Sequence, residues 1–237
     1  MVTTAAPERD CLRPWGTGMW RWHLPHSGHL LAGVTDRSAD VDTLRTRLSN
    51  SRGLVHAEQV HGASLAAVEV PQPLSHPIPG CDALLTRLRG LALVVRTADC
   101  LPIFVWDPLR QLVGLAHVGW RGLDRRLPMR LVRFAAQYAG SRPESLWVAI
   151  GPAIRSCCYE VGREFSQRFG PFVRTVNGRL MCDLIGCATE QLLAVGVRAA
   201  HLVDCGRCTA CESDRWWSVR RDVAGAGRLS SFIMLRP

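Results

Sequence analysis

Short apolar runs separated by polar turns dominate the chain from residue 54 to its end. Runs of about four to eight residues, rich in valine, isoleucine and leucine, are typical of buried β-strands. We therefore expect strands at 54–60, 64–70, 92–95, 101–106, 112–117, 146–150, 200–203 and 229–235.

Helical spacing of apolar positions occurs in a few segments between these runs. It predicts helices at 129–138, 163–169 and 183–195, and Gly140 and Gly196 are stop signals after the first and the last. Residues 40–49 are a further candidate. Because strands outnumber helices and are often consecutive, the pattern favours an α+β fold built in layers.

Other segments carry little regular pattern. Residues 1–28 are rich in glycine, proline and tryptophan, so we expect them to be irregular, and PQPLSHPIP at 71–79 is typical of a surface loop. The 237 residues are 47% hydrophobic and 21% charged, which is ordinary for a globular protein. This length favours a single domain over residues 1–237.

No segment resembles a secretory signal or a membrane span. The opening residues hold no unbroken apolar run, and no run reaches the roughly 18 residues that a membrane-spanning helix needs. We therefore expect a cytoplasmic protein with no membrane partner.

The formal net charge of +9 raises the question of nucleic-acid binding. All 29 basic residues are arginine, which indicates codon bias more than selection for a basic face. The arginines are scattered in short pairs, and few aromatic residues alternate with them. We therefore predict no nucleic-acid partner.

Ten cysteines are present, and they fit no secreted disulfide framework. Cys157 and Cys158 are adjacent, whereas Cys205, Cys208 and Cys211 are spaced three apart. The second group could supply three thiolate ligands to a metal, with a fourth from elsewhere. We interpret it as incidental, as cysteines of a loop in a reducing cell.

Three polar residues stand at the ends of predicted strands, and together they suggest a metal centre. His61 precedes a glycine, Cys100 lies in a polar break between two apolar strands, and His117 ends another strand. Separations of 39 and 17 residues are too long for a zinc-ribbon knuckle. Three protein ligands that leave a fourth position open are typical of a catalytic zinc. Each residue alone also fits a structural role.

Arg121 lies between Gly119 and Gly122, and two glycines permit a tight turn and a close approach to a ligand. The planar fork of a guanidinium binds the oxygens of phosphate in pairs. We count Arg121 as a candidate anion site, although a surface arginine in an ordinary turn explains it equally well. Arg220, Arg221 and Asp222 fit a structural ion network better, with Arg221 a lesser candidate for binding substrate phosphate.

Several motifs occur here in a characteristic order, and they resemble the YfiH-type, laccase-domain family over residues 54–235. Members of that family carry names such as polyphenol oxidoreductase, purine nucleoside phosphorylase and peptidoglycan editing factor. The matching motifs are EQVHG (58–62), CDALLT (81–86), TADCLPI (97–103), AHVGWRG (116–122), IGPAIRSCCYEVG (150–162), CT (208–209) and SVRRD…GR (218–228).

The resemblance implies an α+β domain of mixed β-sheets flanked by helices, with His61, Cys100 and His117 as metal ligands and catalytic residues. It implies phosphorolysis of adenosine, inosine, guanosine and methylthioadenosine, with adenosine deamination as a side activity. Zinc is the expected cofactor, and copper is possible. The alternatives are a copper-dependent laccase, disfavoured because the eight histidines form no H-x-H pair, and a non-catalytic or cell-wall precursor-editing protein.

The expected partners are therefore a small-molecule nucleoside and phosphate, with the chain acting as a monomer or homodimer. Residues 1–50 depart from the family, because the loop around Arg37 is shortened. The candidate substrate-binding residues are Gln59, Arg37, Asp99, Arg121 and Tyr159.

Overall fold

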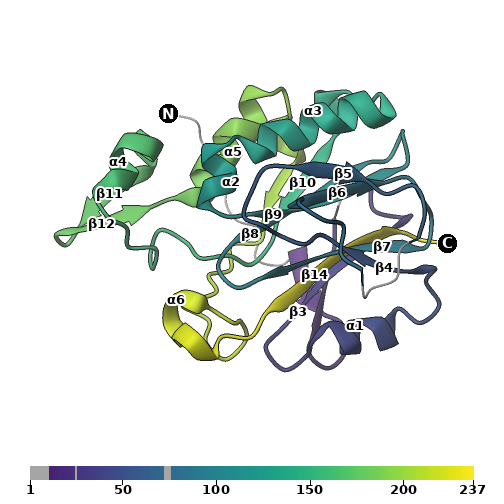
Figure 1. Ribbon diagram of the computed structural model, residues 1–237, viewed down its shortest axis with the longest axis horizontal. Helices are drawn as coiled ribbons and strands as arrows, with labels where there is room; N and C mark the ends of the chain where they lie inside the picture. The colour runs from purple at the N-terminus through teal and green to yellow at the C-terminus, as the bar shows by residue number, and fades with distance from the viewer. Residues whose placement is uncertain (1–10, 25, 72–75) are drawn as a thin grey trace.

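Two six-stranded mixed sheets lie face to face, and helices cover their outer faces (Figure 1). The computed structural model describes residues 11–24, 26–71 and 76–237. The α+β class with mixed sheets flanked by helices is therefore confirmed. No helix among the described residues is long and apolar enough to cross a membrane.

The first sheet contains strands from both the N-terminal and the C-terminal parts of the chain. Its order is β1-β2-β3-β14-β7-β4, with β4 and β7 parallel and the other pairs antiparallel. The strands are β1 (Leu12–Pro14), β2 (Met19–Trp22), β3 (Leu30–Thr35), β4 (Gly53–His56), β7 (Leu91–Thr97) and β14 (Leu229–Leu235).

The second sheet has the order β13-β10-β8-β9-β6-β5, with parallel pairs at both edges. A separate hairpin is formed by β11 (Val173–Val176) and β12 (Arg179–Cys182). The strands of the second sheet are β5 (Leu65–Ala67), β6 (Ala83–Thr86), β8 (Leu101–Asp107), β9 (Leu112–Val118), β10 (Trp147–Ile150) and β13 (Leu202–Asp204).

Strand alternation explains why the molecule has layers. In β7, Leu91, Leu93 and Val95 face the second sheet, whereas Ala92 and Val94 face helix α1 on the other side. Helices α2, α3 and α5 cover the outer face of the second sheet. The helices are α1 (Val41–Arg47), α2 (Trp120–Asp124), α3 (Leu127–Ala139), α4 (Glu164–Phe169), α5 (Leu184–Ala194) and α6 (Val219–Asp222).

All four predicted helices are present, with ends shifted by a few residues. Asp40 caps α1 and Asp183 caps α5, and Gly140 ends α3 in the left-handed conformation. The eight predicted strands also occur, and 229–235 matches β14. Strands β1, β2, β3, β6, β11 and β12 were not predicted.

Two sequence interpretations of the backbone were wrong. The segment 1–28 is not irregular throughout, because β1 and β2 pair there; residues 1–10 and 25 lie outside the described residues. The strand expected at 54–60 ends at His56, so Gln59 and His61 do not alternate along a strand. Of the predicted surface loop at 71–79, residues 72–75 are outside the described part.

Candidate active site

His61, Cys100 and His117 come from separate segments and meet at one end of the two sheets. Cys100 directly precedes β8 and His117 lies near the end of β9, and the antiparallel register places Leu101 opposite Val118. His61 arrives on the loop between β4 and β5. The ligand atoms of the three residues all lie within 4.8 Å of one another. The structure thus brings the predicted triple together.

The loop that carries His61 is held in a demanding backbone conformation. Gln59 and His61 have φ of 65° and 57°, a region that non-glycine residues seldom occupy. The side chain of Gln59 bonds the backbone of Arg96 twice, donating to its carbonyl at 2.6 Å and accepting from its N–H at 2.7 Å. Gln59 therefore ties the loop to β7.

Asp82 organises the site, and the sequence reasoning did not single it out. Its Oδ1 accepts from the backbone N–H of His61 at 3.0 Å, and its Oδ2 accepts from that of Gly62 at 2.6 Å. Oδ1 also lies 2.8 Å from Nδ1 of His117. A signal was present in the sequence, because an acid directly before a buried apolar run is unusual. That β6 pairs with β9 was not visible there.

Hydrogen bonds outweigh burial in setting the charge of Asp82. Burial disfavours the carboxylate, but donation from His117 and from the backbone of Gly62 lowers its pKa. A carboxylate that accepts from one ring nitrogen of a histidine orients the other nitrogen toward a metal. Asp82 therefore fixes the orientation of His117.

Cys100 and His117 shift each other's protonation. Burial opposes ionisation of the Cys100 thiol, yet hydrogen bonds with His117 and His61 lower its pKa to about 7. Burial likewise opposes the charged form of His117, whereas its bonds to Asp82 and Cys100 raise its pKa to about 9. Each group therefore stabilises the charged form of the other. A nitrogen, nitrogen and sulfur donor set of this kind suits zinc or copper.

Gly119 permits the close approach of the chain to this site. A Cβ there would lie 3.1 Å from Sγ of Cys100 and 3.5 Å from the ring of His61. The predicted tight turn between the two glycines is wrong, because Gly119 is the N-cap of α2 and Gly122 lies within that helix. Gly119 is needed for space beside the sulfur, and no positive φ is involved.

A cavity of about 540 Å³ opens over the three residues, a size suited to a small-molecule ligand. Gln59, Arg96 and Arg228 are among the other residues that line it. Both arginines are exposed and bring positive charge to the opening, which the exposed Glu58 also lines. Neither arginine was among the candidate substrate-binding residues.

The other candidate substrate-binding residues lie outside the described lining of this cavity. Both carboxylate oxygens of Asp99 are occupied, one by the hydroxyl of Thr209 at 2.6 Å and one by the backbone N–H of Arg220 at 2.7 Å. The guanidinium of Arg121 lies 4.4 Å from the centre of the Trp120 ring. Their roles toward a substrate remain predictions.

Arg37 and Tyr159 also have partners away from the cavity. Arg37 lies over the ring of Trp217 at 4.3 Å. Tyr159 packs edge-on against Phe165, and burial raises the pKa of its hydroxyl to about 12. Tyr159 is therefore protonated at neutral pH.

Of the ion network predicted for Arg220, Arg221 and Asp222, the pair between Arg221 and Asp222 is present, whereas the side chain of Arg220 donates to the carbonyl of Glu160. Arg221 pairs with Asp222 at 2.7 Å and donates to the carbonyls of Thr209, Ala210 and Trp216. These bonds occupy the guanidinium and anchor the C-terminal loop.

The chain matches known proteins over most of its length. A family model described as multi-copper polyphenol oxidoreductase laccase matches residues 24–236. A protein of Geobacillus stearothermophilus named purine nucleoside phosphorylase YlmD is 35% identical over 220 residues, which cover 84% of this chain and 80% of that protein. A protein of an unknown prokaryotic organism named adenosine deaminase RL5 is 34% identical over 160 residues, covering 64% and 61%.

A solved structure is similar to this chain in both sequence and fold. The crystal structure of YlmD from Geobacillus stearothermophilus superposes with a TM-score of 0.87 at 31% identity, and the match covers 96% of this chain and 100% of that one. The chain therefore belongs to the multi-copper polyphenol oxidoreductase laccase family.

Proposed function

We propose that this chain is a metal-dependent purine nucleoside phosphorylase. It would convert adenosine, inosine, guanosine or methylthioadenosine and phosphate into the free base and sugar 1-phosphate. The observation that carries the proposal is the cavity that joins His61, Cys100 and His117 to the two exposed arginines. The relative named purine nucleoside phosphorylase YlmD supports it. Deamination of adenosine is a side activity that the relative named adenosine deaminase suggests.

His61, Cys100 and His117 would hold the metal, and zinc is our assignment from the donor set. When bound, zinc would supply a Lewis acid to the cavity that these three residues line. Asp82 accepts the Nδ1 proton of His117, which leaves the other ring nitrogen free to act as a ligand. The backbone bonds from His61 and Gly62 to Asp82 hold the carboxylate in place.

Phosphorolysis also needs an anion site beside the sugar. In that reaction a phosphate oxygen forms a bond to the anomeric carbon, the bond from that carbon to the base breaks, and the base takes up a proton. Arg96 and Arg228 line the cavity and carry the positive charge that phosphate requires. We assign the phosphate to this pair and keep Arg121 as the alternative position.

Product analysis tests the proposal. The purified chain is incubated with each of the four nucleosides and phosphate, with zinc, with copper or with a chelator, and bases are separated by chromatography. We expect base release that depends on phosphate and metal and is lost in His61→Ala, while inosine formed from adenosine reports deamination. Oxidation of a polyphenol by the copper-loaded chain is measured in parallel. Absence of base release under every condition would contradict the phosphorylase assignment.

The position of the phosphate is tested separately. Loss of a charge-assisted arginine contact costs roughly 1.5–3 kcal/mol, or about ten- to a hundredfold in affinity. We expect Arg228→Ala to raise the KM for phosphate by about that factor and to change the KM for nucleoside little. Arg121→Ala is the matched comparison. If Arg121→Ala alone raises the phosphate KM, the anion binds at the start of α2 instead.

A further inference from the structure

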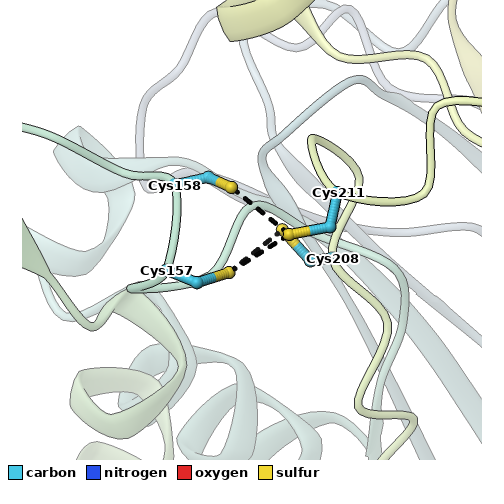
Figure 2. A group of neighbouring side chains, drawn as sticks. All are labelled: Cys157, Cys158, Cys208 and Cys211. Atoms are coloured by element: carbon cyan, nitrogen blue, oxygen red, sulfur yellow. Dashed lines mark hydrogen bonds between the residues drawn. The ribbon is translucent and has the colours of Figure 1, made fainter.

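Four cysteines outside the active site meet in a second cluster, the tetrad Cys157, Cys158, Cys208 and Cys211 (Figure 2). The sulfur of Cys157 lies 3.6 Å from that of Cys208 and 3.5 Å from that of Cys211, and Cys158 lies 3.4 Å from Cys211. All four sulfurs are within 4.8 Å of one another. Figure 2 shows the side chains of two separate loops pointing toward one another.

The sequence interpretation of these cysteines was wrong in its grouping. It joined Cys205 to Cys208 and Cys211 as an incidental run, but Cys205 is fully buried in the core between the two sheets. Cys157 and Cys158, which lie about 50 residues earlier, take its place. One pair is adjacent in sequence and the other has C-x-x-C spacing, which is common in zinc sites.

The fold brings the two loops together through a parallel strand pair. β10 and β13 are parallel neighbours, so the loops that follow them leave the sheet at the same edge. The pairing continues into the loops, where Ala153 and Cys208 form an isolated parallel β-bridge. The N–H of Thr209 donates to the carbonyl of Ala153 at 3.1 Å. Arg155 and Asp204 form two bonds at 2.9 and 2.7 Å across the same gap. The tetrad is therefore assembled on ordered backbone.

The sulfur separations fit a metal site better than a disulfide. Four sulfurs placed tetrahedrally at about 2.3 Å from zinc lie about 3.8 Å apart. A disulfide needs a sulfur separation of about 2.05 Å. The observed 3.4–3.6 Å lies close to the first value.

The environment of Cys208 also suits a thiolate ligand. The backbone N–H groups of Cys211, Arg155 and Ala210 donate to its sulfur. Such bonds partly neutralise the charge that several thiolates bring to one metal. Cys157 and Cys211 are exposed, which leaves a route for a metal ion to enter.

We propose that Cys157, Cys158, Cys208 and Cys211 bind a zinc ion in a structural tetrathiolate site. Four protein ligands leave no open position, which distinguishes this site from the one at His61, Cys100 and His117. Zinc here cross-links the loop after β10 to the loop after β13. Thr209, directly after a ligand, bonds Asp99, the neighbour of Cys100. The site therefore stiffens the support of the active-site cysteine.

Zinc content of the purified full-length chain tests the proposal. We measure zinc in the wild type, in His61→Ala, in Cys211→Ser and in the double variant. Each single change should remove about one zinc ion per chain, and the double variant should hold almost none. The matched control is Cys205→Ala, from the same cysteine run, which should keep the wild-type content. Equal zinc content in Cys211→Ser and the wild type overturns the proposal.

Cobalt substitution provides a second measurement that requires no change in the tetrad. In the His61→Ala background, cobalt at a tetrathiolate site gives intense sulfur-to-cobalt charge-transfer absorption, and reaction of Cys157 and Cys211 with a thiol reagent slows. Absence of that absorption, or a disulfide within the tetrad after purification under reducing conditions, overturns the proposal. Neither measurement depends on enzyme activity, so the zinc and cobalt results can be interpreted even if the phosphorylase assignment fails.

Discussion

At the residue scale, the candidate site depends on short polar contacts that hold unusual backbone positions. Asp99, just before Cys100, has φ of 90°, and His61 has φ of 57°. Such conformations cost about 1–3 kcal/mol each and persist where surrounding bonds impose them. Asp82 supplies those bonds at His61, and Thr209 and Arg220 supply them at Asp99.

Replacement of Cys100 by serine tests whether this cysteine is a ligand. A serine hydroxyl ionises far less readily than a thiol and binds zinc poorly. We expect Cys100→Ser to lose about one zinc ion per chain and nearly all activity while its circular dichroism is unchanged. Cys187→Ala, in α5, is the control. Full metal content without activity would identify Cys100 as a nucleophile or base, a role compatible with its lowered pKa.

Replacement of Asp82 by asparagine tests its positioning role. Both carboxylate oxygens accept hydrogen bonds, so an amide NH₂ group places a donor against a donor on one side. We expect zinc affinity at the three-ligand site to fall about ten- to a hundredfold. Competition with a chelator of known affinity measures it, in a Cys211→Ser background that removes the tetrad site. An unchanged zinc affinity would show that Asp82 serves the fold alone.

At the scale of elements, the short helix α1 shows how a cap and tertiary packing act together. Helix α1 is only seven residues long, too short to be stable alone. Leu44 packs on the first sheet, and the carboxylate of Asp40 accepts from the N–H of Thr43 at 2.9 Å. Tertiary packing and the cap together therefore maintain this helix.

Loss of the cap should lower stability measurably. We expect Asp40→Ala to reduce the free energy of unfolding by about 1 kcal/mol, because the N-terminal N–H of Thr43 loses its acceptor. Asp42→Ala is the control, since Asp42 lies in the same first turn and pairs with Arg45 at the surface, whereas the N–H of Thr43 donates to Asp40. Urea denaturation compares the two. Equal losses in both variants would contradict a specific role for the cap.

At the scale of the whole molecule, the two sheets share one apolar interior. Phe104 of β8 is fully buried, and its ring lies 5.5 Å from that of Trp22 of β2. Trp216, also fully buried, lies 5.5 Å from Trp20. The first strands of the chain and its C-terminal loop are thus packed against the same core.

We therefore propose that residues 1–237 form one cooperative domain, and Phe104→Ala tests it. Loss of a buried phenylalanine costs about 3–5 kcal/mol, so both sheets should melt together at a lower temperature. Calorimetry measures the transition, and Leu109→Ala is the control because Leu109 is 82% exposed. Two separate transitions in the wild type would contradict a single domain.

Local pattern alone predicted much of this protein. The helices α1, α3, α4 and α5 follow from apolar spacing and from caps such as Asp183 and Gly140, which act within a few residues. The long buried strands follow from apolar runs. Cys100 and His117 could be proposed because one precedes such a run and the other lies near the end of one, whereas the strand expected to lead to His61 ends at His56. These signals are local in sequence, so no knowledge of strand pairing was needed.

Only the tertiary structure decided how distant segments meet. The pairing of β6 with β9 places Asp82 beside His117, and the pairing of β10 with β13 joins Cys157 and Cys158 to Cys208 and Cys211. Strand register and sheet order arise from packing summed over the whole core, which no short window of sequence contains. For the same reason, the sequence did not show that Arg228 lines the cavity. It also did not show that Cys205 is buried in the core, apart from Cys208 and Cys211.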